Sequence, residues 1–336
     1  MAKTFRERFL MGEAPFDEIF DLTDEWGFSD VTTPLREYLG LTVREEEIWV
    51  DESDEALEDF MNRERSRKVL FTDLDGTLLH DDKSLSEPIR EMLRAISAAG
   101  HPIVIATGRF TPSALRQFDK LKIDSEGCYL ITCNGAEIYD ISAGKVISRT
   151  AVDRDLIRLC FDEAKAYGIH IQAYGKDKVI TEQDTPELRE YCSLQQIPFI
   201  VTEDVLSCLD EDSPKLLASK NDDPDCVRGF YEVLKEKAGD RLDFFFSNPL
   251  YLEIVSPGTN KGNAVAPLCE HLCIPIRRSV AAGDAENDIS MIRAAGTGIA
   301  IANATPAVKE AADLITEKDN NHDGLLPCLK EIFLDQ

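Results

Sequence analysis

The segment Asp73-Leu74-Asp75-Gly76-Thr77 carries two carboxylates two positions apart, followed at once by a glycine. In an extended segment, side chains at positions i and i+2 point to the same side of the chain. One carboxylate can then attack phosphorus while the other handles the proton of the leaving group, and Gly76 allows a sharp turn after them. Because solvated acidic turns also have the pattern Asp-x-Asp-Gly, this segment alone leaves a purely structural interpretation open.

A second polar segment, Thr107-Gly108-Arg109, follows an apolar run and precedes a helix start at Thr111-Pro112. A hydroxyl and free backbone N–H groups at such a position suit a phosphate oxygen. A simple helix-capping turn has the same pattern, so this segment indicates a phosphate site only in combination with other motifs.

Two later segments complete the set. Lys261 lies at a loop-to-helix junction, although a lone lysine there is usually a surface residue. Residues 283–288 (Gly-Asp-Ala-Glu-Asn-Asp) follow an apolar run, with Asp284 at its tip and Asp288 one helical turn later. An acidic helix start of this kind by itself indicates only dipole compensation.

Taken together and in this order, the four segments resemble motifs I to IV of the haloacid dehalogenase superfamily, and most closely its Cof-type subclass IIB phosphatases. The resemblance covers about residues 68–336, and no catalytic position departs from the pattern. Residues 134–136, 303–304 and 320–324 also resemble that subclass. Each motif is weak or moderate alone, and the set is specific.

The resemblance implies a magnesium-dependent phosphatase with Asp73 as the nucleophile and Asp75 as general acid and then base. A carboxylate reacts poorly with a phosphate dianion unless a cation neutralises the encounter. Hard oxygen ligands suit Mg²⁺, so the expected metal group is Asp73, Asp284, Asp75 through its backbone carbonyl, and Asp288. We expect Asp288 to position metal-bound water or Lys261 rather than to be a primary ligand.

For the phosphate, the expected contacts are a point charge from Lys261 and hydrogen-bond donors from Thr107, Gly108 and Asn287. Arg109 is assigned a supporting role in the same cradle. Preorganised donors of this kind each contribute a few kcal/mol to transition-state stabilisation.

Asp75 must hold a proton in order to protonate the leaving oxygen. A solvated aspartate has a reference pKa of about 3.9 and would be ionised. We therefore expect closure of a second domain to exclude water and raise the pKa of Asp75.

The elements that must position these residues form an α/β pattern from Lys68 onward. Apolar runs at 69–73 and 103–107 flank a helix that Ser86 caps, and further runs lie at 129–132, 280–283 and 298–302. Strands joined through helices predict a parallel sheet, and ligands of such sheets bind beyond the carboxyl ends of the strands. We expect a Rossmann-like catalytic core made of residues 68–150 and 257–336.

Residues 151–256 follow a different pattern and interrupt the core. Helices are predicted over 155–167 and 224–237, with strands around 169–181, 198–202 and 242–254. This favours an inserted α+β cap that acts as a lid and selects the substrate. Five cap residues could contact the leaving group: Tyr174, Lys176, Lys215, Asn248 and Tyr251. A packing or surface role fits each of them better.

Residues 1–67 lie outside the family pattern and favour a small helical N-terminal extension. Residues 1–68 hold 19 acidic and 9 basic residues. The stretch 34–42 predicts a short helix that ends at Gly40, and Thr42 with Glu45 fits a capping box at the start of the next. The extension is a candidate contact for a protein partner or a dimer, and whether it covers the active site stays open.

Composition excludes several partners. A net charge of −26 repels nucleic acid and anionic lipid, so we expect neither as a partner. No apolar run is long enough for a membrane span, and the charged start predicts no signal peptide. The nine cysteines are scattered, and Cys269 with Cys273 is interpreted as one helix face rather than a metal clip. A reduced cytoplasmic protein is expected.

Three alternatives remain at this point: a phosphomutase of the same superfamily, a regulatory binding protein acting through its extension, and a dehalogenase. The second aspartate at 75 disfavours dehalogenation, which needs no general acid there. The complete set of motif residues argues against a vestigial core. Similar phosphatases act on sugar phosphates, on flavin mononucleotide and its precursors, and on pyridoxal phosphate, and the fold cannot choose among these small metabolites.

Overall fold

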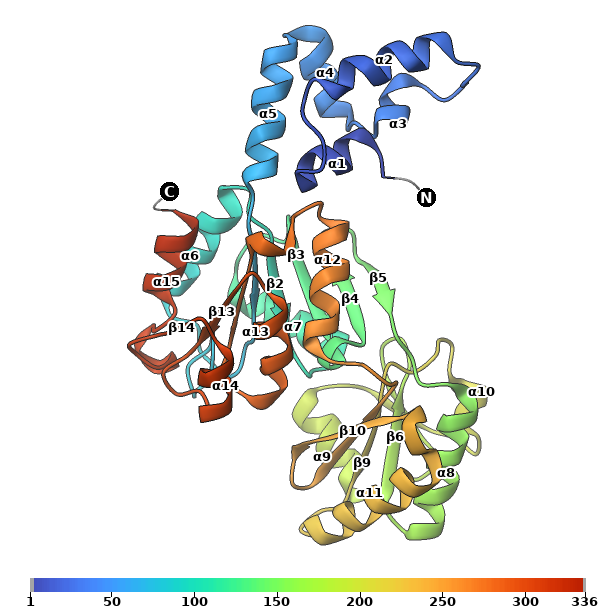
Figure 1. Cartoon of the computed structure of the whole chain (residues 1–336). Coiled ribbons are helices and arrows are strands. Elements are labelled where there is room, and N and C mark those ends of the chain that lie inside the picture. The colour runs from blue at the N-terminus through green and yellow to red at the C-terminus, as the bar shows by residue number, and fades with distance from the viewer. Residues whose placement is uncertain (1–2, 335–336) are drawn as a thin grey trace.

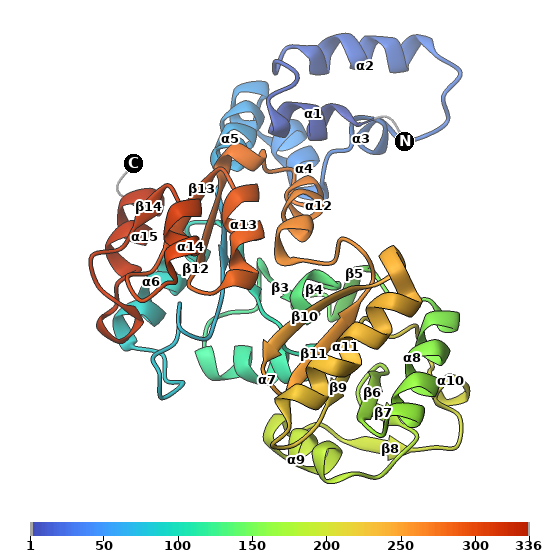
Figure 2. The same cartoon turned by 60° about the horizontal axis from the view of Figure 1, so that its bottom comes forward.

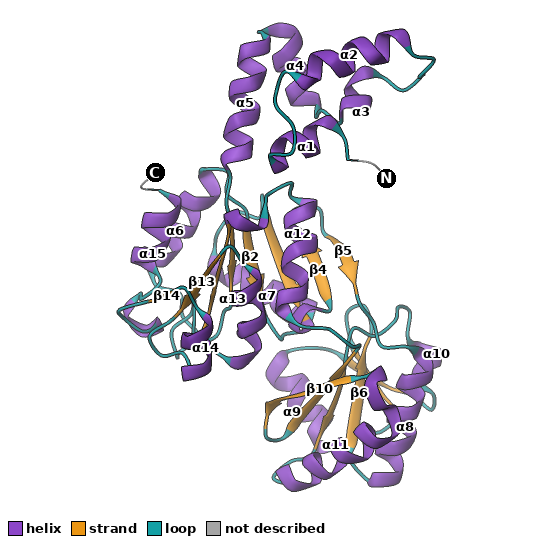
Figure 3. Ribbon diagram, viewed as in Figure 1, coloured by secondary structure: helices purple, strands orange, loops and turns teal. Residues whose placement is uncertain are grey.

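The computed structural model describes residues 3–334, which form five N-terminal helices and two separate β-sheets with their flanking helices (Figure 1). Figure 3 shows that strands are confined to the two sheets while helices surround them. The predicted class, an α/β core with an inserted α+β unit and a helical N-terminal extension, is confirmed. Within the described residues, no helix is both long and apolar enough to cross a bilayer.

The larger sheet has eight strands in the order β14-β13-β12-β1-β2-β3-β4-β5. The first six in that order run parallel, and β4 and β5 are antiparallel additions at one edge. The strands are β1 (Val69–Thr72), β2 (Ile103–Ala106), β3 (Cys128–Thr132), β4 (Glu137–Asp140), β5 (Lys145–Arg149), β12 (Ser279–Gly283), β13 (Thr297–Ala300) and β14 (Leu314–Ile315).

Both faces of this sheet are covered, and its central strands β1, β2 and β12 are therefore buried at every position and mostly apolar. Leu70 and Ile105 face a cluster that includes helices α6 (Glu87–Ala98), α7 (Thr111–Leu121) and α15 (Leu326–Phe333). Phe71 and Val104 face the opposite cluster, built with α12 (Val265–His271) and α13 (Ile289–Ala294). The Ser86 hydroxyl accepts from the Ile89 N–H and caps α6 as predicted. Short helices complete this part: α14 (Pro306–Ala311), η1 (Cys133–Gly135), η3 (Lys261–Ala264), η4 (Ile276–Arg278), η5 (Glu286–Asp288) and η6 (Asn320–His322).

The smaller sheet has six strands in the order β10-β11-β9-β6-β7-β8. Helices α8 (Arg154–Tyr167) and α11 (Pro224–Ala238) pack on one face of it through Phe161 and Phe230. The pattern at 155–167 and 224–237 predicted these two helices. Sequence reasoning did not predict α9 or β9. The remaining elements are β6 (His170–Tyr174), β7 (Val179–Thr181), α9 (Pro186–Gln195), β8 (Phe199–Val201), α10 (Val205–Cys208), β9 (Leu216–Ser219), η2 (Gly239–Arg241), β10 (Asp243–Asn248) and β11 (Tyr251–Val255).

The N-terminal helices have an apolar core of their own, to which Phe5, Phe9 and Leu57 contribute. As predicted, a short helix ends at Gly40, which adopts a left-handed conformation with φ of 75°. The capping box of Thr42 and Glu45 is also present. The helices are α1 (Phe5–Met11), α2 (Glu18–Phe28), α3 (Leu35–Leu39), α4 (Val43–Asp51) and α5 (Asp54–Ser66).

The N-terminal helices and the smaller sheet lie at opposite ends of the larger sheet (Figures 1 and 2). Helix α5 leads directly into β1, so these helices lie at the amino ends of the parallel strands. Arg278 fixes this junction by donating to the Ser66 carbonyl at 2.7 Å. The carboxyl ends of the strands point the other way, toward the smaller sheet. The described part of the extension, residues 3–66, therefore does not cover the carboxyl ends of the strands.

Candidate active site

Side chains from four distant segments meet at the carboxyl end of the larger sheet. Asp73 follows β1, Thr107 follows β2, Asp284 follows β12, and Lys261 begins η3. The parallel pairing of β1 with both β2 and β12 brings the ends of these strands together. The predicted convergence at this end of the sheet therefore has a direct cause in strand order.

Lys261 is fully buried between two carboxylates. Its ammonium donates to Asp73 Oδ1 at 2.6 Å and to Asp288 Oδ1 at 2.7 Å. Burial alone would lower the pKa of Lys261, but Asp73 and Asp288 outweigh it and raise that pKa. A buried cation held in this way is a fixed positive charge beside the Asp73 oxygens.

Asp73 is also buried, and its pKa is raised to about 7. Burial is the main cause, and the neighbouring carboxylates of Asp288 and Asp284 add to it, while Lys261 acts in the opposite direction. A further positive charge near Asp73 would lower this pKa and favour the ionised form that acts as a nucleophile.

The carboxylates of Asp73, Asp284 and Asp288 offer oxygen atoms that all lie within 4.8 Å of one another. Three hard oxygen donors at this spacing fit Mg²⁺, which prefers carboxylate and water ligands. Asp284 also accepts from the Thr77 hydroxyl at 2.8 Å, and burial raises its pKa. These residues fit the magnesium that the sequence predicts.

Asp288 is occupied on both oxygens. Oδ1 takes the Lys261 ammonium, and Oδ2 accepts from the backbone N–H groups of Asp284 and Ala285 at 3.1 and 3.0 Å. Its geometry therefore fits the expectation that it positions Lys261 rather than serving as a primary ligand.

The Asp75 side chain differs from the prediction in its neighbours. It forms ion pairs with Lys83 through Oδ1 and with Arg109 through Oδ2, each at 2.9 Å. Burial raises the pKa of Asp75, but the Lys83 and Arg109 contacts outweigh it and lower that pKa. The expectation of a raised pKa is therefore wrong for this form of the molecule. The Asp75 carboxylate also lies outside the three-carboxylate cluster, so only its backbone carbonyl stays a predicted ligand.

The other predicted phosphate contacts lie close together and form hydrogen bonds with neighbouring residues. The Thr107 hydroxyl oxygen accepts from the Arg109 backbone N–H at 3.2 Å. The Asn287 amide donates to Asn134 Oδ1 at 3.1 Å. A Cβ on Gly108 would lie 2.9 Å from the Asn134 amide nitrogen, so a larger residue here would displace the Asn134 side chain. The Arg109 side chain lies beside the site, where it pairs with the Asp75 carboxylate of the same chain.

Sequence reasoning left Lys83, Asn134 and Thr77 out of the site. Thr77 and Asn134 lie inside segments that the motif pattern had already marked, so their contacts were within reach. Lys83 lies in a polar turn, where no feature of the local sequence separates it from an ordinary surface lysine.

Among the cap residues that the sequence raised for the leaving group, Tyr174 and Lys215 are buried where the smaller sheet contacts the core. That agrees with the packing role preferred for them. Lys176 and Asn248 are exposed and Tyr251 is partly exposed.

Comparisons with known proteins agree with this geometry. Residues 70–329 match the family model of haloacid dehalogenase-like hydrolases. The putative phosphatase YxeH of Bacillus subtilis is 30% identical over 80% of this chain and 98% of its own length. The 5-amino-6-(5-phospho-D-ribitylamino)uracil phosphatase YcsE of the same organism is 31% identical over 80% of this chain and 96% of its own length.

A solved haloacid dehalogenase-like hydrolase from Bacteroides thetaiotaomicron superposes with a TM-score of 0.73, at 28% identity, over 80% of this chain and all of that one. The chain therefore belongs to the haloacid dehalogenase-like hydrolases, and the predicted family is confirmed. It is an enzyme of the phosphatase group within that family. Residues 1–67 lie outside the matched family model.

Proposed function

We propose that this chain is a Mg²⁺-dependent phosphatase that hydrolyses a small phosphorylated metabolite through an aspartyl-phosphate on Asp73. The observation that carries the proposal is the buried contact of Asp73 with Lys261, beside Asp284 and within a cluster of three carboxylates. An oxygen nucleophile, a fixed cation and a set of hard metal ligands at one strand end are what phosphoryl transfer to a carboxylate requires.

In the first step, an Asp73 oxygen forms a bond to phosphorus while the bond from phosphorus to the leaving oxygen breaks. Asp75 delivers its proton to that leaving oxygen. In the second step, Asp75 takes a proton from water, the water oxygen bonds to phosphorus, and Asp73 leaves as a carboxylate with inorganic phosphate as the product. Mg²⁺, held by Asp73 and Asp284, would supply the positive charge that lets two anions meet.

Asp75 needs a proton for the first step, and its two cationic partners oppose this. An incoming phosphate dianion competes with the Asp75 carboxylate for Lys83 and Arg109. We propose that this exchange frees Asp75 to hold its proton, with water exclusion by the cap adding to the effect. Lys83 thereby joins Lys261, Thr107, Gly108, Arg109 and Asn287 among the proposed phosphate contacts.

For the substrate, we propose a small phosphorylated metabolite selected by residues 151–256 acting as a cap over the core of residues 68–150 and 257–336. The similarity to a 5-amino-6-(5-phospho-D-ribitylamino)uracil phosphatase supports including flavin precursors beside sugar phosphates. Release of inorganic phosphate from a panel of such esters is the measurement that identifies the class.

The sharpest test of the nucleophile is Asp73→Asn with a generic aryl phosphate such as p-nitrophenyl phosphate. We expect turnover to fall by at least about 10³-fold, since covalent catalysis is lost, while the far-UV circular dichroism spectrum stays unchanged. Turnover close to that of the unmodified enzyme would refute the assignment. Product analysis separates the alternatives, because a phosphomutase retains phosphate on another hydroxyl.

We further propose that residues 1–67 contact another protein and that the enzyme acts in a reducing compartment, the cytoplasm. Phe28, at the end of the acidic helix α2, is 93% exposed, which is unusual for so large an apolar side chain. All nine cysteines are free, which supports the compartment. The excess of acids favours a basic partner over a second copy, and light scattering of the full chain would detect a dimer.

A further inference from the structure

A buried ion pair in the cap reaches the phosphate-binding loop of the core. Lys215 lies immediately before β9, and its ammonium donates to Glu253 Oε2 of the neighbouring strand β11 at 2.7 Å. The same ammonium donates to the Gly108 carbonyl at 3.2 Å. Both charged side chains are at least nine-tenths buried, so this contact is screened from water.

The residues around Lys215 fix the position of its ammonium group. Its nitrogen lies 5.0 Å from the centre of the Tyr174 ring, and Glu253 Oε1 accepts from the Ser247 hydroxyl. Tyr174 in turn packs on Phe110 of the core with ring centres 4.9 Å apart. The ammonium therefore donates to a carboxylate and to one carbonyl of the core, and it lies beside an aromatic ring.

That carbonyl belongs to a peptide group that is held at both ends. The Gly108 oxygen accepts from Lys215, while the N–H of the same peptide group, on Arg109, donates to the Thr107 hydroxyl oxygen. Because Thr107 Oγ1 accepts this N–H, its own proton remains available to a phosphate oxygen. Rotation of this peptide group would break both contacts and leave the Thr107 hydroxyl without the N–H donor that orients it.

We propose that Lys215 is a positioning residue: it orients the Gly108–Arg109 peptide group and so couples the docked cap to phosphate binding by Thr107. This inference rests on the proposed function for its biological meaning, but phosphate affinity tests it without turnover. In this proposal a cap residue influences phosphate binding. This role is distinct from any contact between the cap and the leaving group.

Replacing Lys215 alone would leave Glu253 buried without a partner, which by itself destabilises a protein. The informative variant is Lys215→Met/Glu253→Met, because an apolar pair of similar volume preserves folding while removing the donor to Gly108. The probe is inorganic phosphate. Its affinity for the Mg²⁺-loaded full chain is measured by calorimetry and as competitive inhibition of p-nitrophenyl phosphate hydrolysis.

We expect the double variant to melt near the wild-type temperature yet bind phosphate about tenfold or more weakly, since a small misplacement of a binding group has effects up to about 100-fold. Phosphate affinity equal to the wild type would overturn the proposal. So would a single Lys215→Met variant whose lost affinity returns when Glu253→Met is added, because the pair would then serve folding alone.

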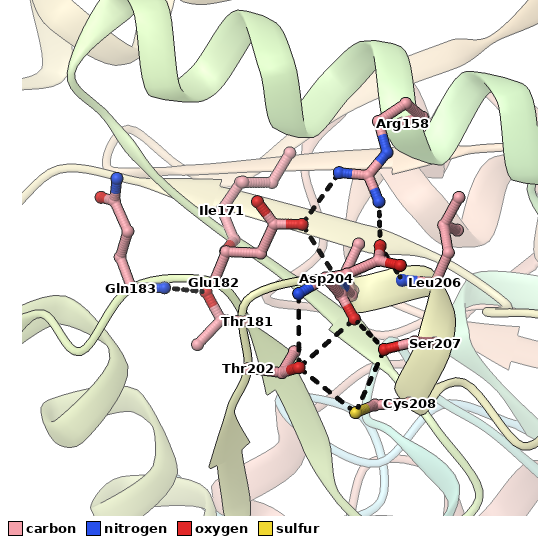
Figure 4. A network of polar contacts seen from close by, with 11 residues as sticks. Arg158, Ile171, Thr181, Glu182, Gln183, Thr202, Asp204, Leu206, Ser207 and Cys208 are labelled. Carbon is pink, nitrogen blue, oxygen red and sulfur yellow. Dashed lines mark hydrogen bonds and ion pairs between the residues drawn. The ribbon is translucent and has the colours of Figure 1, made fainter.

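A matched control removes another cation from the cap. Figure 4 shows Arg158 of α8 between Glu182 and Asp204, an ion-pair network of cap residues. Arg158→Met should leave phosphate affinity unchanged, and an equal loss in this variant would contradict a specific role for Lys215. If the wild-type chain binds phosphate but releases none from any ester, the proposed function is wrong. The comparison of phosphate affinities between the variants would still test the role of Lys215.

Discussion

At the scale of single residues, charge balance explains the site. Asp73, Asp284 and Asp288 bring three negative charges to one place, and Lys261 supplies one positive charge. When all are ionised the cluster holds two excess negative charges, which a divalent cation neutralises. Asp75 with Lys83 and Arg109 has the opposite balance, one excess positive charge, which suits a phosphate group. The two neighbouring groups therefore favour metal and substrate respectively.

The first prediction concerns Mg²⁺ affinity and pH. The pKa of Asp73 is raised to about 7, so below that pH the metal must displace a proton from its ligand. Affinity should therefore fall about tenfold per pH unit below about pH 7, reaching roughly thirtyfold weaker binding at about pH 5.5. Calorimetric titration with Mg²⁺ at several pH values measures this. Equal affinity at pH 5.5 and 8, or a pH dependence that persists in Asp73→Asn, would contradict it.

At the scale of elements, the turn after β1 has a strict steric requirement. Gly76 has φ of +88°, and a Cβ there would lie 2.6 Å from Asp284 Oδ2. The glycine thus allows the first strand's turn to approach the carboxylate that follows β12. The conformation strains any other residue at this point, and a Cβ would displace the Asp284 side chain.

The second prediction follows from this contact. Gly76→Ala should displace Asp284 and weaken Mg²⁺ binding by about tenfold to 100-fold, the usual scale for disturbed metal ligands. Gly127→Ala is the matched control, since Gly127 also has positive φ, at 67°, but a Cβ there meets no atom within 4 Å. Comparable loss of Mg²⁺ affinity in both variants would show that backbone strain, and not the Asp284 contact, is responsible.

The elements also show how far the sequence leads. The strand ends that carry Asp73 and Asp284 could be predicted, because buried parallel strands are continuous apolar runs and their carboxyl ends share one edge. The neighbours of Asp75 could not, because the approach of Lys83 depends on how a polar turn folds. Strand β9 was missed because a run of only three apolar residues, Leu216 to Ala218, fits a buried helix segment equally well.

At the scale of the whole molecule, the core, the smaller sheet with its helices and the N-terminal helices have separate positions. The cap meets the catalytic end of the core, while the N-terminal helices are attached at the amino ends of the strands (Figure 2). Helix α5 joins β1 at the amino end of that strand, whereas Asp73 follows its carboxyl end. We therefore expect the extension to affect what the enzyme binds, and not its chemistry.

The third prediction tests this separation with Phe28→Ser. Because Phe28 is 93% exposed, its replacement should change the free energy of unfolding by less than about 0.5 kcal/mol. The ratio kcat/KM for an aryl phosphate should stay within about twofold of the wild type. Thermal denaturation and steady-state kinetics provide both values, and a large fall in kcat/KM would mean that the extension communicates with the active site.

The covalent step is the part of the account that a chemical trap tests most directly. The Mg²⁺-loaded enzyme would be quenched during turnover of its best substrate and treated with borohydride, which reduces an acyl phosphate to an alcohol. Peptide mass spectrometry should then find homoserine in place of Asp73 and an unmodified Asp75. Homoserine at another position, or none despite continuing phosphate release, would contradict an aspartyl-phosphate on Asp73.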